Sequence, residues 1–107
     1  MKTYKLEQFT RGWLVGDFEP NIIRTKDFEF MVRSYKEGEK EQAHIHKIAD
    51  EITVIVSGVF SMNGNIVTAG DIVHLLPGDA TDFICIESGS TAVVKTPSVM
   101  NDKYLIN

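Results

Sequence analysis

The chain has 107 residues, of which 43% are hydrophobic and 24% charged, with a formal net charge of −4 and a pI near 5.3. This length predicts one domain, and the composition is typical of a globular protein. The acidic balance argues against nucleic acid as a partner, because phosphate binding needs clustered Lys and Arg. No apolar run approaches the roughly 20 residues that span a bilayer, so no membrane association is expected.

The first thirty residues are weakly patterned, and Pro20 excludes a long helix there. The only tryptophan, Trp13, is expected to anchor the core or a dimer, and its alternative place is the rim of a pocket. Residues 21–26 predict a short strand or turn. Residues 30–35 predict a strand with Met31, Arg33 and Tyr35 on one face. The charged run at 36–42 predicts a solvated turn.

Further strands are predicted wherever β-branched and apolar residues lie between turn signals. These segments are 51–56, 59–62, 65–67, 72–76, 82–87 and 91–95, in addition to the strand that holds His44 and His46. The Asn63-Gly64 pair is typical of a type I′ hairpin. Short strands separated by turns at intervals of about 8–12 residues predict an all-β sandwich or barrel. The tail at 101–107 either packs back through Tyr104 and Leu105 or frays.

The candidate chemistry lies at residues 44–58. In a strand, residues two apart share a face, so His44 and His46 point the same way. Glu51 opens the next apolar run after the short segment 47–50. If that segment folds the second strand beside the first, two imidazoles and one carboxylate converge. This donor set is typical of a site for a divalent first-row metal ion, whereas the alternative is a surface His-x-His without function.

The same residues carry a resemblance to a known family. Their spacing resembles the first signature motif of the cupin superfamily, position for position. The matching positions are Gly38, His44, His46, Glu51 and Gly58. The resemblance implies a divalent ion, Fe, Mn, Zn or Ni, bound by the two histidines and the glutamate, which would then be the catalytic centre.

The segment 70–83 is similar to the second cupin motif, with its Gly-Asp opening, apolar strand and Pro-Gly turn. It departs from that motif at Leu76, which occupies the usual proline position, and at Thr81, which replaces the last metal-binding histidine. The resemblance spans about residues 35–95. It implies a small double-stranded β-helix, or jelly-roll barrel, for the single domain 1–107, with a cupin core at about 30–97 and the ligand inside.

Alternation along the strands predicts which residues line the pocket. The expected set is Thr53, Thr81, Phe83 and Cys85. For Cys85, the only cysteine, the alternative is a small buried hydrophobic side chain. A single cysteine and the absence of an apolar N-terminal signal predict a reduced, cytoplasmic protein. Exposure is expected for His74, and also for Arg33 and Lys95, although either cation would bind an anionic substrate if it pointed inward.

Three functions follow as hypotheses. The first is a metal-dependent cupin acting on a small polar metabolite, as a dioxygenase, isomerase or decarboxylase. The second, also implied by the resemblance, is a metal-free sugar-nucleotide epimerase or isomerase that uses His44 or His46 as an acid/base group oriented by Glu51. The third is a non-catalytic module that binds a small ligand. The resemblance further implies a homodimer, and whether the protein is an enzyme stays open.

Overall fold

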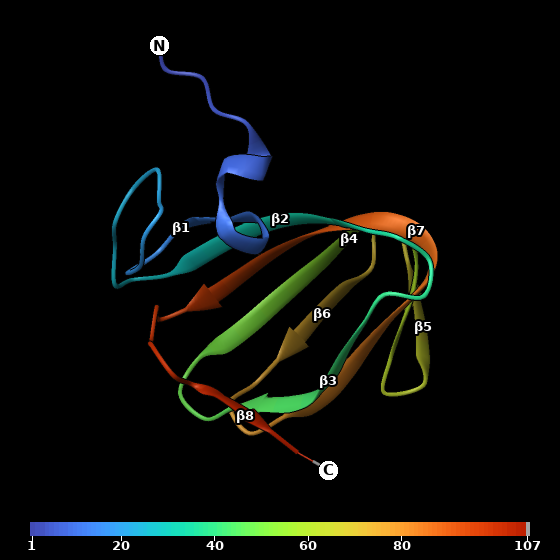
Figure 1. The fold of residues 1–107 in the computed structure, drawn as a ribbon. Coiled ribbons are helices and arrows are strands. Elements are labelled where there is room, and N and C mark those ends of the chain that lie inside the picture. The colour runs from blue at the N-terminus through green and yellow to red at the C-terminus, as the bar shows by residue number, and fades with distance from the viewer. Residues whose placement is uncertain (107) are drawn as a thin grey trace.

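The structure is a computed structural model that describes residues 1–106, and it confirms the all-β prediction (Figure 1). Two short 3₁₀ helices, η1 (Leu6–Gln8) and η2 (Thr10–Gly12), precede the sheet. Eight strands follow: β1 (Trp13–Val15), β2 (Glu29–Tyr35), β3 (Lys40–His46), β4 (Asp50–Met62), β5 (Asn65–Thr68), β6 (Ile72–Leu75), β7 (Ala80–Thr96) and β8 (Lys103–Leu105). No helix within the described part of the chain is long and apolar enough to cross a membrane.

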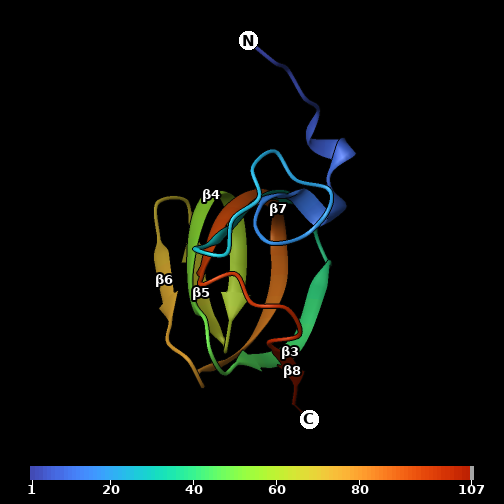
Figure 2. The same ribbon diagram turned by 90° about the vertical axis from the view of Figure 1, so that its left-hand side faces the viewer.

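The strands form one antiparallel sheet that curls round on itself, as the two ribbon views show (Figure 2). Its order is β1-β2-β7-β3-β8, and β4 pairs with β5, β6 and β7. Strand β7 makes this curl possible, because it pairs with β3 near its start and with β2 near its end, and with β4 over much of its length. The inner faces of β3, β4 and β7 therefore look into the same space.

Strands β4 and β7 are each longer than predicted. The sequence predicts separate strands at 51–56 and 59–62, and at 82–87 and 91–95, but β4 and β7 each continue through the gap between them. Gly58 has φ +85°, and a Cβ there would lie 2.6 Å from the Cα of Gly89 on the neighbouring strand. The pairing shifts register around Ser57 and Val59. Glycine and bulges let the strands bend sharply where they would otherwise end.

The closed end of the barrel holds the hydrophobic core. Tyr35, Phe60 and Phe83 contact one another with ring centroids 4.9–5.7 Å apart. Ile55, Met62 and Cys85 complete this cluster. Cys85 was expected in the pocket lining, but it is 1% exposed and packs within the core, because the aromatic rings fill the barrel at that end. Its alternative, a small buried hydrophobe, is the one observed.

The Cys85 thiol is expected to be unreactive in the native protein. Burial, with a smaller contribution from Glu39, raises its pKa above 9.0, and only the thiolate is a good nucleophile. An aromatic disulfide reagent should therefore modify no thiol until the protein is unfolded in guanidinium, and then one thiol per chain. Rapid stoichiometric modification of the folded protein would contradict this placement.

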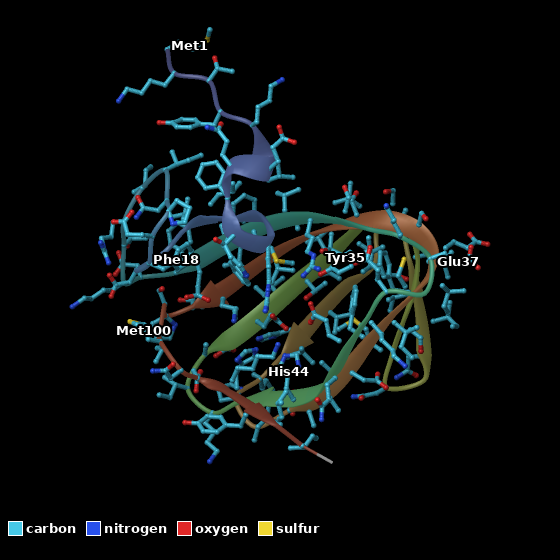
Figure 3. All side chains as sticks on the ribbon, viewed as in Figure 1. Met1, Phe18, Tyr35, Glu37, His44 and Met100 are labelled. Carbon is cyan, nitrogen blue, oxygen red and sulfur yellow. The ribbon has the colours of Figure 1, made fainter. Side chains whose placement is uncertain are left out.

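The two ends of the chain behave differently. Residues 1–8 are exposed and project from the barrel, whereas β8 returns to pair with the His44–His46 end of β3 (Figure 1). The tail was expected either to pack against the barrel or to fray, and residues 103–105 pack against it as β8. Asn107 lies outside the described residues. Figure 3 shows all described side chains, with His44 on β3 beside this returning strand. The tail thus contributes to the wall of the barrel next to the histidines.

Candidate functional site

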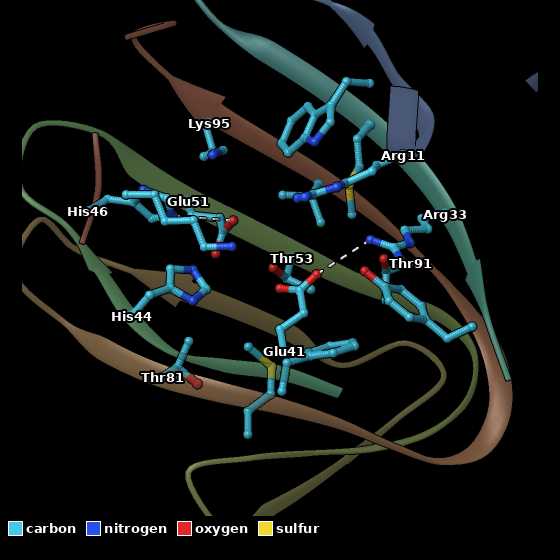
Figure 4. A pocket seen from close by; sticks show the side chains of 17 residues that line it. Arg11, Arg33, Glu41, His44, His46, Glu51, Thr53, Thr81, Thr91 and Lys95 are labelled. Carbon is cyan, nitrogen blue, oxygen red and sulfur yellow. Dashed lines mark ion pairs between the residues drawn. The ribbon is translucent and has the colours of Figure 1, made fainter. Parts of the chain in front are cut away.

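A small cavity of about 110 Å³ lies inside the barrel (Figure 4). Its wall is built from η2, β1, β2, β3, β4, β7 and β8. The lining is rich in polar groups, which is unusual for the interior of so small a domain. The charged and imidazole side chains among them are Arg11, Arg33, Glu41, His44, His46, Glu51, Lys95 and Lys103. A cavity with convergent polar groups is the expected form of a binding site.

Both histidines are oriented by backbone carbonyl groups. Nδ1 of His44 lies 3.0 Å from the carbonyl oxygen of Gln42, and Nδ1 of His46 lies 3.0 Å from that of Asp102. A carbonyl oxygen only accepts hydrogen bonds, so in each neutral ring Nδ1 donates and Nε2 keeps a lone pair. Nε2 of His46 is buried and has no hydrogen-bond partner among residues 1–106. This is the arrangement in which proteins present histidine to a metal ion.

Glu51 lies next to the two imidazoles, at the start of β4. Its Oε1 is 4.0 Å from Nε2 of His46, and the His44 and His46 ring centroids are 5.1 Å apart. The three predicted ligands are therefore neighbours. Within the described residues, however, no three His, Cys, Asp or Glu side chains stand in metal-binding geometry. The donors face the same cavity without forming a finished ligand set.

The environment keeps both imidazoles neutral. Burial lowers the pKa of His44 and of His46 below 6.5, and the positive charge of Lys95 acts in the same direction on both. Burial also raises the pKa of Glu51, while Lys95 opposes this effect. Lys95 is paired across the sheet with Glu51 on one side and with Glu29 on the other. Neutral imidazole is the form that binds metals.

Asp102 is a structural contributor to the site that the sequence did not predict. Its carboxylate is buried and accepts the backbone N–H groups of Lys47, Ile48 and Ala49 at 2.9–3.1 Å. Burial raises its pKa, but these hydrogen bonds outweigh that effect and the pKa is lowered below 3.8. Asp102 therefore fixes the turn between the histidines and Glu51, while its own carbonyl orients His46. No motif marks a lone Asp in the tail.

Glu41 is a second missed residue, because the sequence placed it in a solvated turn. It belongs to β3 and lines the cavity, with its carboxylate 3.6 Å from the Arg33 guanidinium. Simple alternation would put Glu41 and His44 on opposite faces. The register shift between them changes that parity, as β-bulges do. A bulge of this kind leaves no clear signal in the sequence.

Of the predicted lining, Thr53, Thr81 and Phe83 do face the cavity. Thr81 pairs across the sheet with His44, and its hydroxyl donates a 2.7 Å hydrogen bond to the Asp82 carbonyl. Its hydroxyl hydrogen is thus engaged by the backbone. The residue at the usual position of the last cupin histidine is close to the site but is a poor ligand.

The expectations for the remaining polar strand residues are partly wrong. Arg33 and Lys95 were expected to be exposed, but both line the cavity, with side chains 28% and 17% exposed. Trp13 also lines it, with the Lys95 Nζ 4.8 Å from its ring centroid, so the rim position describes it better than a core anchor. His74 is on the outside as expected, 2.8 Å from Asp50.

Comparisons with known proteins identify the fold. No family model matches the chain, and no curated protein sequence matches it. A conserved double-stranded β-helix protein from Klebsiella pneumoniae is a similar solved structure, with 19% identity, a TM-score of 0.71, and coverage of 97% of this chain and 90% of that one.

Two further solved structures have the same fold. A DMSP lyase from Ruegeria pomeroyi has 20% identity and a TM-score of 0.71 over 87% of this chain, which spans about half (49%) of the lyase. An RmlC-like cupin from Shewanella frigidimarina has 18% identity and a TM-score of 0.57, over 73% of this chain and 82% of that one. Identities this low show the fold alone. The chain has the double-stranded β-helix fold of the cupins, as its motifs predicted.

Proposed function

We propose that this protein binds a divalent first-row metal ion through His44, His46 and Glu51, and that the ion binds or activates a small polar metabolite in the barrel. The observation that carries the proposal is Nε2 of His46, which is buried, unpaired among the described residues and 4.0 Å from the Glu51 carboxylate. An unsatisfied buried polar atom costs about 1–3 kcal/mol. A metal ion between these groups would remove that cost.

The donor set fits the proposed ion. Two neutral imidazole nitrogens and one carboxylate suit Fe, Mn, Zn or Ni, and three protein ligands leave positions for water or substrate. Thr81 at the fourth cupin position keeps the protein contribution at three. When bound, the ion would supply Lewis-acid polarisation of a substrate oxygen. The protein's own part is to orient the two rings through Gln42 and Asp102 and to limit the ligand by the size of the cavity.

The size of the cavity also bears on the two alternatives. Pockets for drug-sized ligands usually have volumes of about 300–1,000 Å³. At about 110 Å³ this cavity favours a ligand much smaller than a sugar nucleotide. The metal-free epimerase is therefore the weaker hypothesis. A module that binds without turnover would use the same cavity, and assays of turnover would distinguish it from an enzyme.

The test is calorimetric titration of metal-stripped protein with Zn²⁺, Mn²⁺ and Ni²⁺. One ion per chain should bind, and Glu51→Gln should weaken binding at least about tenfold, because the variant removes an anionic ligand. Glu7→Gln is the matched control, because Glu7 is exposed in η1, away from the cavity. Unchanged affinity in Glu51→Gln, or no binding to the unaltered protein, would refute the proposal.

A further inference from the structure

The lining of the cavity has the opposite charge balance to the rest of the chain. Four cations, Arg11, Arg33, Lys95 and Lys103, face two carboxylates, Glu41 and Glu51. The protein as a whole has a net charge of −4. Arg33 and Lys95 are partly buried, so their charges are screened less than on the surface, whereas Arg11 and Lys103 are exposed residues of the lining. The interior therefore favours an anion although the whole molecule is acidic.

Two of the four cations are already paired. The guanidinium of Arg33 lies 3.6 Å from Glu41 and 3.9 Å from Glu39, and the Lys95 ammonium lies 3.3 Å from Glu29. Arg11 and Lys103, in contrast, have no carboxylate within 4.0 Å among residues 1–106. These two side chains are the ones available to a ligand. Arg11 is the better candidate, because its planar fork fits a carboxylate with two hydrogen bonds.

The backbone holds Arg11 at this place. Arg11 has φ +52°, a left-handed conformation that residues other than glycine rarely adopt. The next residue, Gly12, has φ +80° and packs so closely on β2 that a Cβ would lie 2.0 Å from the Val32 carbonyl oxygen. The turn of η2 is thus seated on the wall of the barrel. In Figure 4, Arg11 extends into the pocket from the side of Arg33, opposite His44 and His46.

From this placement we infer that the cavity takes a small carboxylate, and that Arg11 binds its carboxylate group and sets this specificity. The inference shares its cavity with the proposed function but does not require the metal ion. The cavity of about 110 Å³ holds a carboxylate group and a few further non-hydrogen atoms. The four cations of the lining attract either anion, so the titration with inorganic phosphate described below distinguishes a carboxylate from a phosphate.

Trp13 provides the measurement, because it is the only tryptophan and lines the cavity. Metal-stripped protein is titrated with lactate, with neutral lactamide and with inorganic phosphate while Trp13 fluorescence is recorded. Lactate should give a saturable change that weakens with added salt, and lactamide should give none. Arg11→Gln should weaken lactate binding at least about tenfold, as expected for the loss of a charge-assisted hydrogen bond.

Arg24→Gln is the matched control and should bind like the unaltered protein, because Arg24 is an exposed partner of Asp17 and Glu19. Arg11→Lys should recover part of the affinity, since it keeps the charge but not the fork. Equal response to lactate and lactamide, unchanged binding in Arg11→Gln, or saturation by phosphate alone would overturn the inference. A metal titration separates the two proposals. Metal binding without lactate binding refutes only the carboxylate site, and lactate binding without metal binding refutes only the metal site.

Discussion

Alanine at His44 or at His46 is expected to weaken divalent metal binding by more than about 100-fold. Loss of a partner that only orients a metal-bound histidine already costs about 10–100-fold, and loss of the ligand itself costs more. Both histidine residues are 6% exposed, and their rings present Nε2 to the cavity because Nδ1 is hydrogen bonded to the backbone. Calorimetry with Zn²⁺ on each purified variant measures the change, and circular dichroism checks that the barrel is folded.

His74→Ala is the matched control for these variants. His74 is the third histidine of the chain, but it lies outside the cavity and pairs with Asp50 at 2.8 Å. Its removal should leave the metal affinity unchanged. If His74→Ala weakens binding as much as His44→Ala does, the ion binds at the outer surface and the assigned site is wrong.

Asp102→Ala is expected to lower the free energy of unfolding by about 3 kcal/mol. The variant removes one buried carboxylate that accepts three backbone N–H groups, one buried and two partly buried, and a buried donor left without an acceptor costs about 1–3 kcal/mol. The turn that follows His46 loses its anchor at the same time. Urea unfolding measures the stability, and the same protein should bind Zn²⁺ more weakly because the ring of His46 is less well oriented.

Asp79→Ala provides the comparison for Asp102→Ala. Asp79 is also a turn aspartate, but it is exposed and its carboxylate accepts a single N–H, that of Leu76, at 2.9 Å. The expected loss there is about 1 kcal/mol or less. Equal destabilisation by the two variants would show that burial and the number of hydrogen bonds at Asp102 do not matter.

The stabilisation by Asp102 should also depend on pH. Its folded-state pKa is lowered relative to the ordinary value of 3.8, so the contribution is complete above that value and is lost as the pH falls through the lower folded-state pKa. The stability difference between the unaltered protein and Asp102→Ala should therefore be constant from neutral pH to about pH 5 and shrink in stronger acid. A difference that grows on acidification would contradict the assigned sign.

The fold and the position of His44, His46 and Glu51 at one cavity could be predicted because the relevant signals are local. Alternation placed His44 and His46 on one face, and turn residues marked most strand ends. The same alternation placed Arg33 with Met31 and Tyr35 on a face that proves to be largely buried, so its inward position could have been inferred. A cation inside a small barrel is costly unless it is paired, and the partner of Arg33 is not visible in the sequence. Glu41 supplies that pairing.

Other features of the site depend on contacts between distant parts of the chain. Asp102 is more than fifty residues from the turn that it holds, and nothing in the sequence joins them. Arg11 reaches the cavity only because η2 folds onto β2, in a conformation that no periodicity predicts. Glu41 faces inward because of a bulge in β3. These placements follow from tertiary packing rather than from local pattern.

The most direct test of the account is a crystal structure of the protein with bound Zn²⁺, in which anomalous scattering locates the ion. We expect one ion in the cavity, about 2.0–2.1 Å from Nε2 of His44 and Nε2 of His46 and about 2.0–2.2 Å from a Glu51 oxygen. An ion held through either Nδ1, an ion outside the barrel, or a Glu51 carboxylate turned away from it would contradict the site proposed for this protein.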